Sequence, residues 1–302
     1  MRTVLLGPQR RPTLEGVIRS LFPFPGPAGP VAAITAGWQE REPDDAELMA
    51  LLGGRAVNLA LYRRWLDVQD RDLEYRAGER DLAGVLAELQ ELYLLRLDYA
   101  MQAVYAVQRR SASAPGDALA EAVEAVRELD AAHLSRVNGA RGEFFARLVP
   151  HERPVIAEHR AEVSAALASA PALVIAGGHV GVLAEVLHLF NIAAALPSAP
   201  GSLVIAWSAG AMAMADRIVL FGDRSAHGPG HAEVYGSGLS LLRDVVLLPH
   251  ARARLLLDDT PRMAVLARRF APARCVPLEA GTRIDVPADG AWPPGIRTIE
   301  AA

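Results

Sequence analysis

The stretch Leu203–Met214, LVIAWSAGAMAM, predicts a short apolar strand, a tight turn that holds Ser208 and the start of a helix. Glycine and alanine surround the serine, and such small residues let the backbone bend sharply and let a substrate come close. A serine on a strand-to-helix turn is lifted to the end of a sheet, which is the architecture of a nucleophile elbow. The stretch therefore predicts an α/β fold that presents a hydroxyl at one edge of its sheet.

The segment one unit upstream repeats this plan. Leu173–Ala176 is predicted to be a strand, residues 177–179 (Gly-Gly-His) a turn, and the residues from about Val182 a helix. Two consecutive units of this kind place both turns at the carboxyl end of one parallel sheet, where open α/β sheets bind ligands. We therefore expect the glycine turn and Ser208 to belong to one site.

The amino-terminal part follows a strand–helix rhythm, with strands expected at residues 1–6, Val31–Gly37 and Ala56–Tyr62. This rhythm is typical of a parallel sheet wrapped by helices. It stops between residues 65 and 148, where apolar residues recur at helical spacing on both sides of one short turn. We expect a helical hairpin there, inserted into a single α/β domain over residues 1–302. Two roles of this hairpin stay open: it could be a packing or dimerisation arm, or a lid over the site.

Two further segments bring polar residues to strand ends. An apolar run ends at Pro249-His250, and a later strand ends at the turn Glu279-Ala280-Gly281. Between Ser208 and this part, the segment 227–238 (HGPGHAEVYGSG) is expected to be a loop because it is rich in glycine. The tail from residue 288 is expected to be peripheral.

Composition narrows the class of protein. Of the 302 residues 51% are hydrophobic and 22% charged, with a net charge of −4 and a pI of about 6.1. These values allow a large core and give no general attraction to nucleic acid or to an anionic membrane. No run of about 18 apolar residues and no basic segment before an apolar run occurs, so we expect a cytoplasmic protein without a membrane span.

The cysteine and histidine content argues against a disulfide or a metal. Cys275 is the one cysteine, and it lies in an apolar strand candidate, so we expect a buried and inert thiol. His227, His231 and Glu233 lie in a Gly/Pro segment, where two histidines four residues apart do not share a helix face. We therefore expect neither a metal nor a cofactor.

A serine nucleophile needs a base, and the base is usually oriented by a carboxylate. We prefer His250 because it ends an apolar run and follows Pro249, which stiffens the backbone. Two positions for the acid stay open. Glu279 follows the base at a strand-end turn, whereas the order found in α/β-hydrolases would require an acid between Ser208 and His250. Four acids lie there: Asp216, Asp223, Glu233 and Asp244.

Four motifs in this order resemble the serine peptidases of the dipeptidase E and cyanophycinase family: GGH-x-G-x-L, WSAGAM, GSGLSLL with VVLLPH, and PLEAGT. The resemblance covers Leu173–Val286 well, Val31–Tyr62 weakly and the helical hairpin not at all. It implies the class I glutamine amidotransferase-like fold, with a mostly parallel, doubly wound, flavodoxin-like sheet. In that fold most other members use cysteine at the elbow.

The resemblance also implies roles for individual residues. Ser208 would be the nucleophile, His250 the general base and Glu279 the orienting carboxylate. The backbone N–H groups of Gly178 and Ala209 would form the oxyanion hole, as expected for donors at a glycine turn and a helix N-terminus. Gly177 and His179 would lie beside the substrate.

The implied reaction is hydrolysis of a small peptide or amide bond through an acyl-enzyme. The sequence departs from the family at Ala206, where glycine is common, and at His179, where an amide or acid is usual. The family prefers aspartyl linkages, and Arg224, Arg252 and Arg254 lie near segments that could bind such a carboxylate.

Two other hypotheses stay open. One is a catalytically inactive protein of this fold that acts as a binding or assembly module, including a homodimer, through its helical hairpin. The other is an esterase or lipase with the α/β-hydrolase order, and this hypothesis is weakened because no histidine follows His250.

Overall fold

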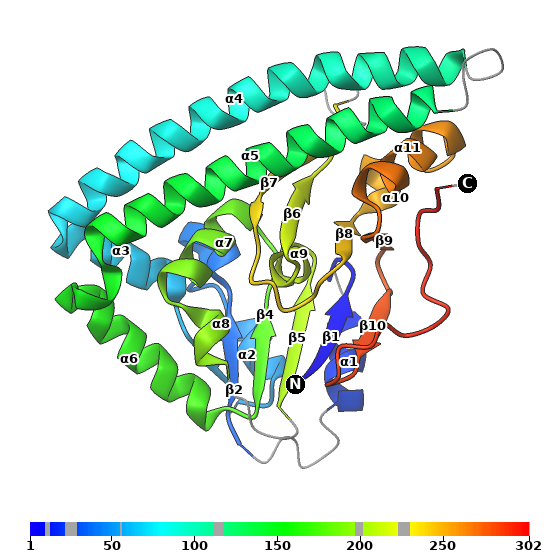
Figure 1. Cartoon of the computed structure of the whole chain (residues 1–302). Helices are drawn as coiled ribbons and strands as arrows, with labels where there is room; N and C mark the ends of the chain where they lie inside the picture. Colours follow the sequence, from blue (N-terminus) through cyan, green and yellow to red (C-terminus); the bar gives the residue numbers. More distant parts are fainter. Residues whose placement is uncertain are drawn as a thin grey trace.

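A computed structural model of the chain describes residues 1–9, 13–21, 29–54, 56–110, 117–196, 202–222 and 230–301. Its centre is a six-stranded sheet with the strand order β10-β1-β5-β4-β2-β3 (Figure 1). The strands are β1 (Arg2–Leu6), β2 (Val31–Ile34), β3 (Ala56–Asn58), β4 (Ala172–Ile175), β5 (Leu203–Trp207) and β10 (Arg283–Val286). All neighbours are parallel except β1 and β10. The chain is therefore an α/β protein with a mainly parallel sheet, as predicted.

The first strand lies away from the second. β1 pairs with β5, in a register that sets Leu6 opposite Trp207, and two strands separate it from β2. Gly7 therefore leaves β1 beside the point where Ser208 leaves β5. This placement brings the carboxyl end of β1 to the edge of the sheet where the elbow stands.

Helices cover both faces of the sheet, because its central strands are apolar on both sides. On one face, alternate strand residues such as Val4, Leu6 and Ile205 pack against α1 (Thr13–Leu21) and α2 (Ala46–Leu51). On the other face Leu5, Val204 and Ile175 share a larger core with the remaining helices. These are α3 (Leu61–Arg71), α6 (Pro154–Ser169), α7 (Val180–Leu189), α8 (Ile192–Ala195), α9 (Ala209–Met214) and α11 (Thr260–Phe270), with the short helices η1 (Ala36–Arg41), η2 (Pro150–Glu152) and α10 (Ala251–Arg254) nearby.

Two strand pairs stand beside the main sheet. β6 (Arg217–Leu220) and β7 (Glu233–Ser237) are antiparallel, and β8 (Val245–Pro249) and β9 (Arg274–Leu278) are parallel. The prediction of a loop over residues 227–238 is therefore wrong in part, because β7 lies within this segment. Buried and half-buried side chains alternate along β7, which pairs with β6 and packs under the helical hairpin. These contacts with distant segments make the glycine-rich stretch a strand.

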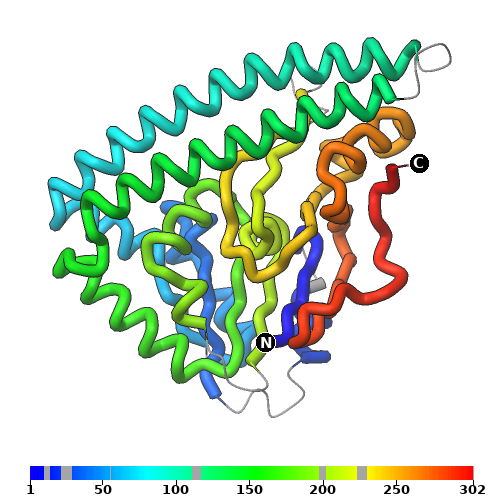
Figure 2. The backbone as a smooth tube through the Cα atoms, viewed as in Figure 1, coloured from blue at the N-terminus to red at the C-terminus, as the bar shows by residue number. Residues whose placement is uncertain are grey.

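The predicted helical hairpin is present as α4 (Leu73–Arg109) and α5 (Ala118–Leu148), which run antiparallel across one side of the molecule (Figures 1 and 2). We call this pair the arm. Its inner face is apolar and joins the core that covers the sheet. The buried side chains of α4 are Tyr75, Tyr93, Leu97, Met101 and Val104, and those of α5 include Val123, Val126, Val137 and Phe144.

A buried polar cluster fastens the arm to the rest of the fold. Arg269 of α11 is 3% exposed, and its guanidinium donates to both carboxylate oxygens of Asp130 in α5, each at 2.7 Å. It also donates to the Ala232 carbonyl oxygen at 2.6 Å and to the Tyr93 hydroxyl of α4 at 3.0 Å. The Tyr93 hydroxyl in turn donates to Asp130 at 2.8 Å. Each buried polar group is thereby satisfied, as burial of a charge requires.

Two other boundaries differ from the sequence predictions. The strand expected over Ala56–Tyr62 ends at Asn58, because Ala60 turns the chain with φ 49° and α3 begins at Leu61. The strand expected over Val31–Gly37 ends at Ile34, because η1 begins at Ala36. The tail from residue 288 has no buried residue among those described, as expected for a peripheral segment, and Ile299 pairs with Cys275 and packs against the core. Cys275 is buried as predicted, and burial raises the pKa of its thiol to about 12. Within the described ranges, the helices are all too short or too polar to cross a membrane.

Candidate active site

Ser208 occupies a sharp turn between β5 and α9. Its backbone has φ 52° and ψ −119°, a region that side chains other than glycine rarely adopt. The Ser208 N–H donates to the Leu6 carbonyl oxygen at 3.2 Å, and the Ser208 carbonyl oxygen accepts from the Met212 N–H at 3.0 Å. A strained residue of this kind costs about 1–3 kcal/mol and persists only where its surroundings hold it. Ser208 therefore has the backbone geometry predicted for an elbow.

Two glycines make the room for this turn. A Cβ added to Gly177 would lie 2.9 Å from the Cβ of Ser208, and a Cβ added to Gly210 would lie 2.4 Å from the Ile175 carbonyl oxygen. The elbow is thus pressed against the carboxyl end of β4 on both sides of the serine. The glycine turn and Ser208 lie together, as the two repeated strand–turn–helix units predicted.

The glycine turn is held from the other side by η1. The His179 N–H donates to the Gly37 carbonyl oxygen at 2.7 Å, and Gly178 has φ 128°, which only glycine adopts without strain. Among the described residues, neither the Gly178 N–H nor the Ala209 N–H has a hydrogen-bond partner. Two unpaired donors near an elbow can receive the negative charge of a tetrahedral intermediate.

His179 caps the helix that follows it. Its Nδ1 accepts from the Val182 N–H at 3.2 Å, which satisfies one of the free donors at the start of α7. The imidazole is exposed. Because Nδ1 accepts, the proton of the neutral ring lies on Nε2, which can donate to a bound molecule.

His250 and Glu279 leave neighbouring strand ends. Pro249 of β8 pairs with Leu278 of β9, and the His250 N–H donates to the Leu278 carbonyl oxygen at 3.1 Å. The Glu279 carboxylate accepts from the Arg252 N–H at 2.7 Å, in the helical turn that His250 begins. Both side chains are partly buried. The structure thus brings the predicted base and the predicted acid to one turn of the chain.

Gly7 joins this turn to the elbow. Its N–H donates to the Thr282 carbonyl oxygen at 3.0 Å, and a Cβ at Gly7 would lie only 1.7 Å from the Glu279 carbonyl oxygen. Leu6, directly before it, accepts the N–H of Ser208. Ser208 and the Glu279 turn therefore border the same end of β1.

The other acids considered from the sequence lie elsewhere. Asp244 precedes β8 and is at the opposite end of that strand from His250. Asp216 follows the far end of α9, beside Arg217, and Glu233 on β7 accepts from Gln90 of the arm at 3.0 Å. Asp223, Arg224 and His227 lie outside the described residues.

Of the three arginines expected near a site for a substrate carboxylate, Arg252 and Arg254 lie in the described residues and make different contacts. Arg252 contributes its backbone N–H to Glu279, and the Arg254 guanidinium lies over the Phe221 ring, 5.9 Å from its centroid. No group of three or more metal-binding side chains occurs in the part of the chain that the structure describes.

One residue near the site has a strained backbone that the sequence does not predict. Gln39 has φ 57° and ψ −127°, nearly the backbone angles of Ser208, and follows Gly37 by two residues. Its loop is held to α3, because the Glu42 carboxylate accepts the N–H groups of Tyr62 at 3.1 Å and Arg63 at 2.8 Å. Neither glycine nor asparagine marks position 39, so the pattern of residues gives no hint of the turn.

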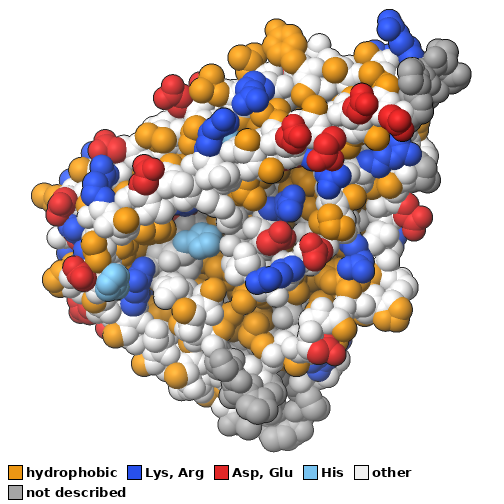
Figure 3. Space-filling model, viewed as in Figure 1, with side chains coloured by type: hydrophobic (Ala, Val, Ile, Leu, Met, Phe, Trp, Pro, Cys, Tyr) orange, Lys and Arg blue, Asp and Glu red, His pale blue; other side chains and the backbone are white. Residues whose placement is uncertain are grey.

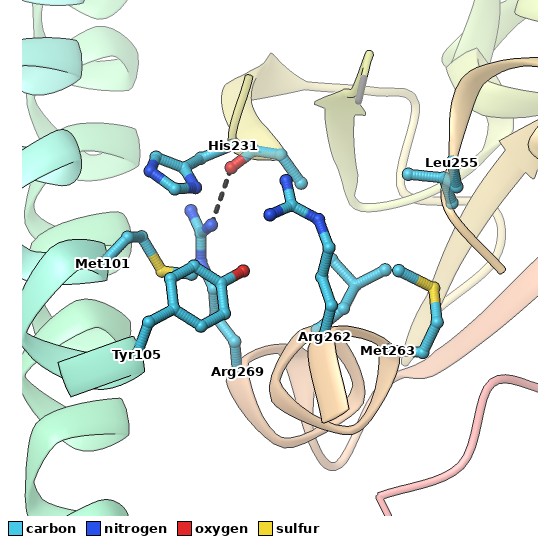
Figure 4. Close-up of a pocket in the computed structure, with 9 residues that line it drawn as sticks. Met101, Tyr105, His231, Leu255, Arg262, Met263 and Arg269 are labelled. Atoms are coloured by element: carbon cyan, nitrogen blue, oxygen red, sulfur yellow. Dashed lines mark hydrogen bonds between the residues drawn. The ribbon is translucent and has the colours of Figure 1, made fainter. Parts of the chain in front are cut away.

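A small cavity between α4 and α11 lies apart from this edge (Figure 4). Tyr105, His231, Arg262 and Arg269 are among its lining residues, and Arg269 donates to the Ala232 carbonyl oxygen at its wall. Its volume of about 20 Å³ is room for about one water molecule. The cavity is therefore a packing defect beneath the arm and too small for a peptide.

Comparison with known proteins does not identify a reaction for this chain. No family model and no curated protein matches the chain. Among solved structures, the chain is similar to a peptidase from an acI-B1 Actinobacterium, with 12% sequence identity and a TM-score of 0.47. The match covers 100% of this chain and 91% of that chain. A likeness this weak carries no argument about activity.

Proposed function

We propose that the chain is a serine hydrolase that cleaves a small peptide or amide bond, of the dipeptidase E and cyanophycinase type. The observation that carries this proposal is the backbone of Ser208, strained at φ 52° at the edge of the sheet and enclosed by glycines. A serine with an ordinary structural role has no need of this conformation. Strain of this kind clusters at active sites.

In the proposed mechanism, the Ser208 hydroxyl attacks the carbonyl carbon of the scissile bond. His250 accepts its proton and returns it to the leaving amine, and Glu279 stabilises the imidazolium that forms. The N–H groups of Gly178 and Ala209 bind the oxyanion. Water then attacks the acyl-enzyme ester, with His250 again accepting a proton, and releases the acid product and free Ser208.

Three contacts support this assignment. His250 and Glu279 end adjacent parallel strands, the Glu279 carboxylate is held in the helical turn begun by His250, and Gly7 joins that turn to the strand beside Ser208. Glu279 accordingly fits the role of acid better than Asp244, which lies at the far end of β8. We infer on the same grounds an amidotransferase-like fold in which the arm is an insertion.

The test is hydrolysis of a panel of dipeptides and aminoacyl p-nitroanilides by the wild type and by Ser208→Ala. We expect the variant to lose activity by about 10⁴-fold or more, as for removal of other triad serines. Ser20→Ala is the matched control, because that hydroxyl lies on α1 and bonds only locally and to Arg283. Equal activity of wild type and Ser208→Ala would overturn the proposal.

A separate observation favours assembly through the arm. Large apolar side chains are exposed along the outer face of α4: Val85 at 48%, Leu92 at 53%, Leu95 at 58% and Tyr99 at 67%. Figure 3 shows hydrophobic side chains at the surface of the arm, interspersed with charged ones. Steps of seven, three and four residues between them match a coiled-coil seam, which two helices bury together.

We propose a second copy of the chain as the partner of this seam. Glu91 and Arg96 flank it, both exposed, five residues apart. In a parallel pair of α4 helices, this spacing sets Glu91 of one copy beside Arg96 of the other. The charges thus favour self-association in parallel orientation over an unrelated partner. A homodimer is compatible with catalysis, and it would also serve an inactive assembly protein.

A further inference from the structure

Strand β7 is clamped between the arm and α7. The Val234 N–H donates to the Tyr93 hydroxyl of α4 at 3.0 Å, and the Ser237 hydroxyl donates to Asn138 of α5 at 2.9 Å. On the other side, His188 Nε2 of α7 donates to the Ser237 carbonyl oxygen at 3.2 Å. The position of β7 over α7 therefore depends on the arm.

Tyr235, in the middle of β7, reaches the first turn of α7. A Cβ added to Gly181 would lie 2.5 Å from the Tyr235 hydroxyl oxygen and 3.2 Å from Cε1 of His179. The phenol can approach this closely only because residue 181 has no side chain. Gly181 follows the Gly177-Gly178 turn within one helical turn, so the hydroxyl lies at the start of the helix that this turn begins.

The Tyr235 hydroxyl is available to a ligand. It has no hydrogen-bond partner among the described residues, and it is not one of the fully buried unpaired atoms. Burial of the ring raises the pKa of the phenol, so the hydroxyl keeps its proton and can donate at neutral pH. The Nε2–H of His179, beside it, is a second outward donor.

We propose that Tyr235 is a substrate-binding residue, which donates a hydrogen bond together with His179 to an oxygen of the peptide substrate. The arm then serves the site by holding β7 at the height where this hydroxyl meets α7. The inference rests on the proposed serine hydrolase function. The oxygen belongs either to a polar side chain of the substrate or to its main chain.

The first experiment measures kcat and KM of Tyr235→Phe with aspartyl, asparaginyl and leucyl p-nitroanilides. Loss of one hydrogen bond predicts about a tenfold fall in kcat/KM, mainly through KM, with an unchanged melting temperature. A fall confined to the first two substrates assigns the oxygen to the side chain. An equal fall with all three assigns it to the main chain.

Tyr105→Phe is the matched control, because Tyr105 is partly buried like Tyr235 but lines the small cavity between α4 and α11, apart from the site. We expect this control to match the wild type. An unchanged kcat/KM of Tyr235→Phe with every substrate would overturn the inference.

A second pair of variants tests the contact with Gly181. Gly181→Ala places a methyl group on the Tyr235 hydroxyl and should lower both stability and kcat/KM. In the double variant Gly181→Ala/Tyr235→Phe, the ring atom nearest to the new methyl group is Cζ, at 3.1 Å. The stability should therefore recover, whereas kcat/KM should stay at the level of Tyr235→Phe. Additive stability losses would contradict the contact.

Labelling of Ser208 by a small phosphonofluoridate separates the two proposals. The reagent is too small to need Tyr235, so we expect equal labelling rates in the wild type and Tyr235→Phe. Wild type that is not labelled would overturn the proposed function and this inference with it. Normal labelling with an unchanged kcat/KM would overturn this inference alone.

Discussion

At the scale of single residues, the elbow depends on glycines that allow close backbone contact. A methyl group on Gly210 would lie 2.4 Å from the Ile175 carbonyl oxygen, and neither backbone segment can move freely inside the core. Gly210→Ala should therefore lower the free energy of unfolding by about 1–3 kcal/mol, the usual cost of overpacking. Urea titration followed by circular dichroism measures it.

The matched control is Gly84→Ala. Gly84 lies in α4 with open space around its Cα, so alanine there should stabilise the helix by up to about 1 kcal/mol. If Gly210→Ala were as stable as the control, the close packing of the elbow on β4 would be wrong.

Some of the site could be predicted from single residues and some could not. Ser208 and the glycine turn follow from apolar runs that end in small residues, a local signal. Gln39 shares the strained backbone of Ser208, but its loop is held by contacts that are distant in sequence, from Glu42 to α3 and from Gly37 to the glycine turn. The position of Tyr235 depends on contacts of β7 with β6, α7 and the arm, so the residues around it alone predict a loop.

At the scale of elements, the buried cluster around Arg269 carries the contact between the arm and α11. Removing its charge leaves Asp130, which is 4% exposed, without its counter-ion. Arg269→Met should lower the free energy of unfolding by about 3–5 kcal/mol, as for other broken buried pairs. Differential scanning calorimetry provides the measurement.

Arg19→Met is the control for this experiment, because Arg19 pairs with Glu15 at the surface. An exposed pair is worth at most about 1 kcal/mol. A loss of the same size in both variants would show that the cluster does not hold the arm.

The junction of α3 and α4 should give a pH dependence. Burial raises the pKa of Glu79 to about 7 from an ordinary 4.5, although its carboxylate accepts from Trp65 and Gln69. Between these two values the folded chain holds a proton that the unfolded chain has released. The stabilisation is thus complete below pH 4.5 and is lost as the pH rises through 7.

Glu79→Gln should remove this dependence. Between the two pKa values, the wild type should lose about 3 kcal/mol relative to the variant, at about 1.4 kcal/mol per pKa unit. Unfolding curves at several pH values test the prediction, with the exposed Glu88→Gln as control. Parallel pH profiles for wild type and Glu79→Gln would show that Glu79 titrates normally.

At the scale of the whole molecule, the arm has two faces with different proposed tasks. Its inner face continues the core and holds β7, and its outer face carries the apolar seam on α4. Neither the packing on β7 nor the exposure of the seam follows from helical periodicity alone, which shows only that apolar residues recur. The α/β class, in contrast, follows from the strand–helix rhythm because each unit is local.

The apolar seam on the outer face of α4 predicts that the protein is a dimer in solution. Size-exclusion chromatography with light scattering should give twice the chain mass of 32.3 kDa at micromolar concentration. Leu92→Glu/Leu95→Glu should be a monomer with an unchanged far-UV circular dichroism spectrum, because a buried carboxylate disfavours the seam and both side chains lie outside the core. A wild type that elutes as a monomer would rule out the proposed dimer.

The central claim is that Ser208 is a nucleophile activated by His250 and Glu279. The most direct measurement is the intact mass of the protein after reaction with a phosphonofluoridate, followed by peptide mapping. The account predicts one adduct on Ser208, no adduct in Ser208→Ala, and a labelling rate reduced by about 10²-fold or more in His250→Ala. Absence of an adduct on the folded wild type, or an equal rate in His250→Ala, would contradict it.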